Sequence, residues 1–423
     1  MRKQSRDHVQ PAPTLSRHVL ANGVRVVIEE HRRSEVVALQ LWVQAGGRDE
    51  TASELGLAHY LEHLLFKGTV TRPAGFIDRE VEGVGGRMNA GTSLDYTYYH
   101  MLLPARRALA GIETLADISV NATLDEGLLE REKRVVLEEM RLSEDSPTRF
   151  LARQLHGAAF AGHAYGRPII GTRELILGLT REQLLRFYRR HYVPEAFTLV
   201  VVGAVDPAEV LAVATTAFGQ LTRGGTRRLP PASSGEGQPR HVELERPGSH
   251  AYVGLAWHAP KLDHADTPAV DLLVTILGQG RGSRLIRALR ERLGLVNTIA
   301  TGYAAMEGAG VVTLSAQLDP AHLPQAEAEI WQEIRRVRDT GVTPPELERA
   351  RTTEEARREF QTETAEGRAF ALGHAVTVWR LEEEEAYLHR LRAVTREQVR
   401  AAARRYLDLT QFARVVFRPP ERR

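Results

Sequence analysis

The feature that most constrains the fold is an internal repeat. Residues 179–203 read LTREQLLRFYRRHYVPEAFTLVVVG and residues 394–417 read VTREQVRAAARRYLDLTQFARVVF, with the motif TREQ at Thr180 and again at Thr395. Threonine followed three residues later by glutamine is a capping box, which predicts that a helix begins at each threonine. Each predicted helix runs into an apolar, β-branched segment. We therefore expect two similar halves, each ending in the same helix-then-strand unit.

The length of the chain agrees with two halves. A chain of 423 residues is too long for one compact core, so two domains of roughly 200 residues are expected. Residues 219–241, between the repeats, are rich in Gly, Pro, Ser and Arg and show no hydrophobic period, which is typical of a linker. We predict a first domain over 1–222, a linker over 223–241 and a second domain over 242–423.

Strand patterns precede helix patterns in both halves. Alternating or continuous apolar runs predict strands near 23–31 and 36–47, and again near 241–247 and 251–260. Helical periodicity covers 55–67, 105–121 and 128–143, and later 269–277 and 283–293. This order favours an α+β fold over a parallel doubly wound sheet. The expected architecture is two homologous domains, each an antiparallel sheet packed with helices.

Charge and cysteine content exclude several classes of protein. The 56 Lys and Arg nearly balance the 54 Asp and Glu, and a net charge of +2 gives no reason to expect a nucleic-acid or membrane partner. The chain has no cysteine, so a zinc ion would need His, Asp or Glu ligands. The N-terminal sequence is polar and no run of 18 apolar residues occurs. We expect a cytoplasmic protein, and a periplasmic location stays open if a signal peptide has been removed.

The segment GLAHYLEHLLFKGT, residues 56–69, places His59 and His63 four residues apart with Glu62 just before the second. On a helix, residues i and i+4 share a face, so both imidazoles can reach one tetrahedral ion. Glu62 lies where it can contact a water at that ion without being a ligand. H-x-x-E-H is a zinc peptidase signature. The alternative is a half-buried helix that carries two histidines, a match expected by chance in roughly a few per cent of such chains.

A third ligand is expected from EGLLEREKRVVLEEMRLSEDSP, residues 126–147. Glu132 and Glu139 are two helical turns apart and share a face, from which Glu138 is rotated away. One of the two could bind the metal while the other orients a ligand or the water. The alternative for either residue is a solvated ion pair with the arginines of the same helix.

Five segments, in order along nearly the whole chain, resemble the pitrilysin and insulysin clan of inverzincin metallopeptidases. They are HYLEHLLFKGT, GGRMNAGTSLDYTYYH, EREKRVVLEEM, HAYGRPIIGT and FYRRHYVPEAFTLVVVG. The similarity is greatest to the short two-domain branch, which includes mitochondrial processing peptidase and bacterial relatives. The resemblance implies Zn²⁺ held by His59, His63 and Glu139, with Glu62 as the general base and Glu132 as the supporting acid.

The resemblance also implies a substrate site. In the family an edge strand pairs with an extended peptide substrate, and here Asn89, Ala90 and Gly91 fall in the corresponding segment, which we predict to be a strand within residues 81–99. The alternative is an ordinary turn between two core strands. Arg290 corresponds to an arginine that binds the substrate carbonyl. Its usual partner, a tyrosine seven residues later, is replaced by Asn297, and Tyr303 lies nearby.

The missing tyrosine bears on the expected assembly. In the short branch, the zinc site and the Arg/Tyr pair are often divided between two subunits that close like a clamshell. We therefore expect a zinc-dependent endopeptidase that hydrolyses peptides or unfolded polypeptide segments. It would be the catalytic subunit of a heterodimer with a related accessory subunit, or of a homodimer. The alternative is a non-catalytic core or assembly subunit of the same fold, against which the intact set of metal-site residues argues.

Overall fold

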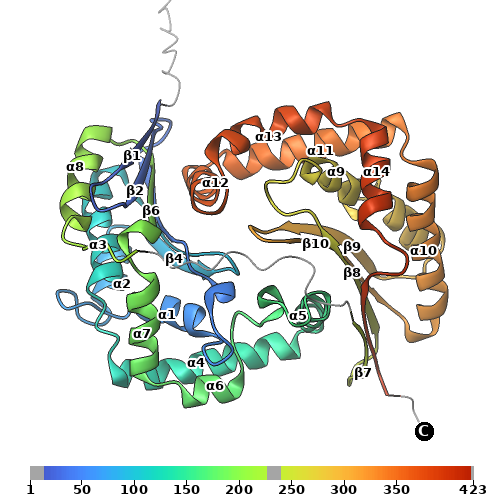
Figure 1. Ribbon diagram of the computed structural model, residues 1–423, viewed down its shortest axis with the longest axis horizontal. Coiled ribbons are helices and arrows are strands. Elements are labelled where there is room, and N and C mark those ends of the chain that lie inside the picture. Colours follow the sequence, from blue (N-terminus) through green and yellow to red (C-terminus); the bar gives the residue numbers. More distant parts are fainter. Residues whose placement is uncertain (1–13, 226–239, 421–423) are drawn as a thin grey trace, which may run out of the picture.

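The computed structural model, which describes residues 14–225 and 240–420, contains two β-sheets packed with helices (Figure 1). The two sheets lie in different halves of the chain, and helices cover both of them. The expected mixed fold of two helix-packed sheets is confirmed.

The first sheet has six strands in the order β1-β2-β6-β3-β5-β4. Its central strand β6 has the sequence FTLVVVG and is buried along its whole length, which explains its unbroken run of apolar residues. Neighbouring strands are antiparallel except for β2 and β6, which are parallel. The strands are β1 (Thr14–Val19), β2 (Arg25–Glu30), β3 (Val36–Val43), β4 (Arg87–Thr92), β5 (Thr97–Pro104) and β6 (Phe197–Gly203).

The second sheet, of five strands, repeats the first sheet without β1. Its order is β7-β11-β8-β10-β9, so that β7 to β11 occupy the places of β2 to β6. The pair β7 and β11 is parallel, as β2 and β6 are. The sheets are mainly antiparallel, as predicted, and each has one parallel pair because the last strand of each half returns beside β2 or β7. The strands are β7 (His241–Glu245), β8 (Ala251–Ala259), β9 (Thr298–Ala305), β10 (Gly310–Leu318) and β11 (Ala413–Arg418).

The repeated TREQ motif begins equivalent helices in the two halves. In α7 (Arg181–His191), the Gln183 side chain accepts from the Thr180 backbone N–H at 2.9 Å, and the Thr180 hydroxyl accepts from the Gln183 N–H at 3.3 Å. Thr395 and Gln398 make the same reciprocal pair at α14 (Arg396–Tyr406). Each helix is followed by the strand at the same place in its sheet, β6 or β11, as predicted.

Most of the remaining predicted helices are present. Periodicity correctly predicted α1 (Leu57–Leu65), α3 (Ala108–Val120), α4 (Glu126–Asp145) and α9 (Thr267–Gly278). The residues predicted as a helix over 283–293 contain the π-helix Ile286–Arg292. None of the described helices is both long and apolar enough to cross a membrane. The other helices are α2 (Phe76–Glu82), α5 (Pro147–Ala159), α6 (Arg173–Gly178), α8 (Pro207–Phe218), α10 (Leu323–Thr340), α11 (Pro344–Thr362), α12 (Ala365–Val378) and α13 (Leu381–Ala393).

The strand predicted within residues 81–99 is present as β4, and the same segment also holds parts of two other elements. This segment contains the end of α2, the strand β4, a tight connection and the start of β5. The chain turns between the strands where the Ser93 N–H donates to the Tyr96 carbonyl. A hairpin has the same alternation in both strands, so the pattern alone could not separate them.

Each sheet is covered on one face by a helix from the other half. Helix α12 packs on β3 and β6 of the first sheet, and α5 packs on β8 and β11 of the second (Figure 1). The contact of α12 is close, because a Cβ added to Gly373 would lie 2.0 Å from Nε1 of Trp42 on β3. The halves are thus interlocked, and each depends on the other for part of its core. Because much of the predicted linker (226–239) lies outside the described residues, the predicted domain boundaries stay a proposal.

Candidate metal centre

Helix α1 presents its polar face to the site and its apolar face to the first core. The buried residues of α1 are Leu57, Ala58, Tyr60, Leu61, Leu64 and Leu65. His59, Glu62 and His63 lie between them at i, i+3 and i+4, and therefore share the opposite face. The Tyr60 hydroxyl donates to the Leu129 carbonyl at 2.5 Å, which ties α1 to the first turn of α4. This contact aligns the two helices that carry the predicted metal ligands.

The start of α1 is fixed by a buried carboxylate that sequence patterns did not reveal. Glu50 accepts from the backbone N–H groups of Gly56 at 3.0 Å and Ala58 at 2.8 Å. These are among the amide groups that have no partner inside the helix. Burial raises the pKa of Glu50 to about 8. Gly56 has φ +96, and a Cβ there would lie 2.9 Å from Cα of Gly171, so this glycine also allows the segment around Gly171 to dock on the helix.

Three predicted ligands converge. Nε2 of His59 and Nε2 of His63 each lie 3.6 Å from Oε2 of Glu139. Among the described residues, these three form the one group of His, Asp or Glu whose ligand atoms could bind a common ion, with all atoms within 4.8 Å of one another. Ligands about 2.0–2.1 Å from a tetrahedral Zn²⁺ are about 3.4 Å apart. Two imidazoles and one carboxylate therefore fit Zn²⁺ in chemistry and spacing.

Glu132 and Glu138 lie on different faces of α4, as the helical spacing predicts. Oε1 of Glu132 lies 2.9 Å from Nδ1 of His63, while its Oε2 is 3.5 Å from the Lys67 ammonium. Burial would raise the pKa of Glu132, but the hydrogen bond with His63 and the charge of Lys67 outweigh it and lower the pKa. Glu138 is exposed and pairs with Arg141 at 2.7 Å. Glu132 thus contacts a candidate ligand, and Glu138 does not contact the site.

The two histidines differ in environment. Burial lowers the pKa of His59 to about 4, and the nearby His63 adds to the shift, so this imidazole is neutral at pH 7. Burial also acts to lower the pKa of His63, but the hydrogen bond with Glu132 and the surrounding carboxylates outweigh it and raise the pKa. Contact with Glu132 fixes Nδ1 as the donor of His63, which leaves Nε2 as the ligand atom.

Glu62 is oriented by a residue that sequence analysis missed. The Thr92 hydroxyl donates to Oε2 of Glu62 at 2.7 Å. Burial raises the pKa of Glu62, and the hydrogen bond from Thr92 opposes the shift. Thr92 is the last residue of β4, so the strand predicted to align substrate also positions the predicted base. The only sequence signal was its place directly after Gly91.

The three predicted substrate-binding residues lie on the edge strand of the first sheet. Asn89, Ala90 and Gly91 pair with His100, Tyr99 and Tyr98 of β5, and β4 has no strand on its other side among the described residues. A Cβ on Gly91 would lie 2.7 Å from the Tyr98 ring. The small residue is thus explained by a ring on the neighbouring strand of the same sheet.

The structure does not bring Arg290 to the cluster. Arg290 lies in the π-helix of the second half, is exposed, and makes no hydrogen bond or ion pair with any described residue. Asn297, directly before β9, is also exposed. Tyr303 lies near the place of the missing tyrosine, and its hydroxyl donates to the Pro260 carbonyl at 2.5 Å within the second half.

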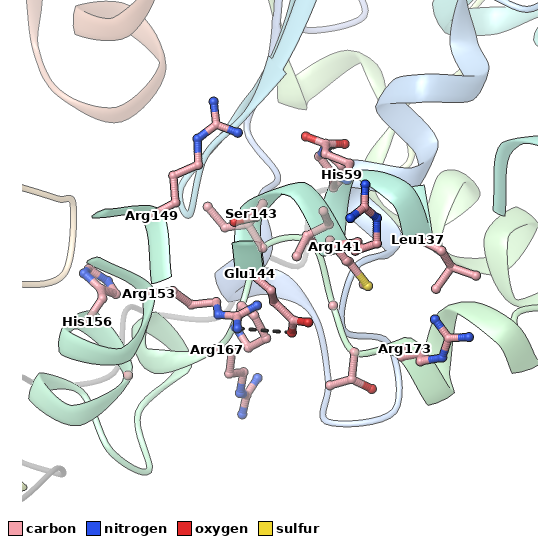
Figure 2. Close-up of a pocket in the computed structure, with 18 of the residues that line it drawn as sticks. His59, Leu137, Arg141, Ser143, Glu144, Arg149, Arg153, His156, Arg167 and Arg173 are labelled. Atoms are coloured by element: carbon pink, nitrogen blue, oxygen red, sulfur yellow. Dashed lines mark hydrogen bonds and ion pairs between the residues drawn. The ribbon is translucent and has the colours of Figure 1, made fainter. Parts of the chain in front are cut away.

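A cavity of about 1270 Å³ opens beside the cluster (Figure 2). His59, Glu139 and Thr92 form one part of its wall. Leu94, α4, α5 and residues 166–174 form the rest of the wall. The cavity is thus continuous with the candidate metal centre and with the end of the edge strand.

Comparisons with known proteins cover most of the chain. The family model described as Insulinase (Peptidase family M16) matches residues 25–173, and the model described as Peptidase M16 inactive domain matches residues 178–354. An uncharacterized zinc protease of Mycobacterium leprae is 34% identical over 334 residues, which are 78% of this chain and 75% of that protein. A second uncharacterized zinc protease, from Mycobacterium tuberculosis, is 32% identical over 421 residues, 97% of this chain and 95% of that protein.

Two further relatives extend the comparison. The probable mitochondrial-processing peptidase subunit beta of Arabidopsis thaliana is 30% identical over 314 residues, 71% of this chain and 58% of that protein. The crystal structure of a protease from Helicobacter pylori superposes with a TM-score of 0.90 at 24% identity, covering 96% of this chain and all of that one. The cluster of His59, His63 and Glu139 lies within the segment matched by the first family model.

Proposed function

This chain belongs to the peptidase M16 family, and we propose that it is a zinc-dependent endopeptidase that hydrolyses peptides or unfolded polypeptide segments. The observation that carries the proposal is the convergence of His59, His63 and Glu139 on one point, with Glu62 on the same helix face. The names of its bacterial relatives, zinc proteases, support the same chemistry.

His59, His63 and Glu139 would bind the metal. A bound Zn²⁺ would supply a Lewis acid that makes a water more acidic and polarises a peptide carbonyl. Glu132 keeps the proton of His63 on Nδ1 and thereby keeps Nε2 directed at the metal position. Nδ1 of His59 has no hydrogen-bond partner among the described residues, and burial lowers the pKa of this imidazole to about 4, so it is neutral at pH 7.

Glu62 would act as the general base. Its Oε2 accepts the Thr92 hydrogen bond, which leaves Oε1 to take a proton from the attacking water and return it to the leaving amine. The strand that ends in Thr92 would pair with an extended peptide through its free edge, including Asn89, Ala90 and Gly91. Main-chain pairing tolerates many side chains, so this mode suits substrates of varied sequence.

The second half suggests that the site is completed by another subunit. Arg290 is exposed and unpaired among the described residues, and Asn297 stands where the family has its tyrosine. We therefore propose a clamshell dimer in which this chain is the zinc-bearing subunit, with a related accessory subunit or a second copy as its partner. A relative whose name identifies it as one subunit of a processing peptidase supports this arrangement.

The test is cleavage of a quenched-fluorescence peptide library by the purified chain, with products identified by mass spectrometry. We expect cleavage at internal peptide bonds that is lost on chelation and restored by Zn²⁺. A chain that carries one zinc and cleaves nothing, alone or with a co-purified related subunit, would contradict the proposal and favour a non-catalytic assembly subunit. Sedimentation that finds a fully active monomer would contradict the dimer.

A further inference from the structure

Six arginines line the cavity beside the candidate metal centre. They come from α4, α5 and the segment 166–174, and Figure 2 shows Arg149 and Arg153 among the side chains that line the same cavity as His59. Four glutamates also line the cavity, and one of these is Glu139 of the cluster. The six arginines are Arg134, Arg141, Arg149, Arg153, Arg167 and Arg173.

The acidic groups that line the cavity pair with only two of these arginines. Glu138 pairs with Arg141 at 2.7 Å, and Glu144 pairs with Arg153 at 3.2 Å. Arg167 donates to the backbone carbonyl of Glu50 at 2.6 Å, so its charge stays uncompensated. The other three, Arg134, Arg149 and Arg173, make no hydrogen bond or ion pair with any described residue.

Arg149 is placed against the local preference of its helix. It lies in the first turn of α5, which begins at Pro147, where the helix dipole favours negative side chains and disfavours positive ones. No carboxylate compensates for this position among the described residues. Residues that break a local rule without a compensating contact are expected mainly at functional sites.

The position of the cavity relates it to the substrate. Its wall includes His59 and Glu139 of the cluster and Thr92 at the end of the edge strand. A peptide paired with β4 and cut at the cluster would therefore have a side chain near the scissile bond at the mouth of this cavity. His156 also lines the wall, but burial lowers its pKa to about 4, so it is neutral at pH 7. The positive charge therefore comes from arginines, which keep it at any physiological pH.

We propose that this arginine-lined cavity is a specificity site that binds an acidic side chain, Asp or Glu, of the peptide close to the scissile bond. The proposal rests on the peptidase function proposed above and names the substrate class of that site. Guanidinium groups bind carboxylates through two parallel hydrogen bonds, which makes arginine suited to this recognition.

The test is a peptide series in which one position at a time, on either side of the cleaved bond, is Glu, Gln or Lys. At one position we expect kcat/KM for Glu to exceed that for Gln on the order of 10-fold, the effect of one charge-assisted hydrogen bond. Arg149→Glu should abolish this preference or invert it toward Lys. The substitution is compatible with folding, because glutamate is favoured in the first turn of a helix.

A matched control separates local from overall charge. Arg189 is exposed on α7 and does not line the cavity, so Arg189→Glu makes the same change in net charge elsewhere. This variant should keep the preference for Glu. If Arg189→Glu reduces the preference as much as Arg149→Glu does, the cavity is not the specificity site.

Binding provides a readout that does not depend on cleavage. The anisotropy of labelled Glu and Gln peptides is measured with the zinc-loaded Glu62→Gln chain, using peptides with free and with amidated C-termini. Tighter binding of the Glu peptide, lost in a chain that also carries Arg149→Glu, supports the inference even if no peptide is ever cleaved. Equal affinity for the Glu and Gln peptides, or a preference that disappears on amidation, would overturn it.

Discussion

The contact between Glu132 and His63 allows a quantitative prediction about metal binding. Oε1 of Glu132 lies 2.9 Å from Nδ1 of His63, and the Glu132 side chain is only 9% exposed. Glu132→Gln keeps an oxygen that can accept this hydrogen bond but removes the charge that favours it. Glu132→Ala removes both and leaves the imidazole free to rotate. The two variants therefore separate orientation from charge.

The size of the effect follows from the role of such contacts. Loss of a group that orients a metal ligand typically weakens metal binding about 10- to 100-fold, or about 1.4–2.8 kcal/mol. We expect Glu132→Gln near the lower value and Glu132→Ala near the upper. Lys67, the other partner of Glu132, is 44% exposed, so its ammonium can return to water and adds little to the cost.

The assay is competition for Zn²⁺ with a chromophoric chelator. Glu138→Gln is the matched control, because Glu138 is on the same helix, is exposed and pairs with Arg141 away from the cluster. It should bind Zn²⁺ like the unmodified chain. If Glu132→Ala also keeps its zinc affinity within about twofold, far below the loss expected for an orienting group, then Glu132 does not position His63 for the metal.

Two further predictions concern the start of α1 and the contact of α12 with the first sheet. Glu50→Gln leaves one of the two backbone N–H groups at the start of α1 facing an NH₂ group. Thermal unfolding should therefore show that the free energy of unfolding falls by about 1–3 kcal/mol. Unchanged stability would contradict the capping role of Glu50. Burial lowers the pKa of His374, which packs near Trp42, to about 4. In the unfolded chain the pKa of a histidine is near 6.5. The neutral, buried His374 therefore contributes stability that is complete above pH 6.5 and is lost as the pH falls toward 4. The loss between pH 7 and 5 is at most about 2 kcal/mol. Denaturant unfolding should show that His374→Gln lacks this pH-dependent loss of stability. His389 is exposed, so His389→Gln should keep the loss. Equal pH dependence of the two variants would refute the assignment.

Local periodicity explains what could be predicted from the sequence. The TREQ capping boxes, the β-branched strands and the shared faces of His59 with His63 and of Glu132 with Glu139 all depend on residues close in the chain. Residues that are four positions or two full turns apart share a face in any α-helix. No tertiary contact is needed to predict those features.

Contacts between distant segments explain what could not be predicted. Thr92 meets Glu62 only because β4 packs beside α1, and Glu50 meets the start of α1 only because the chain folds back on itself. The exchange of α5 and α12 between the two sheets and the arginine cavity have the same origin. No spacing rule brings such groups together, since their proximity depends on the packing of whole elements.

The central claim is that Glu62 is the base of a zinc peptidase site. The most direct test measures zinc content and peptide cleavage in parallel for the unmodified chain and for Glu62→Gln. We expect one zinc per chain in both proteins, cleavage by the unmodified chain, and none by Glu62→Gln, because the amide cannot accept the proton. Cleavage that survives in Glu62→Gln, or zinc that is lost together with activity, would contradict this assignment.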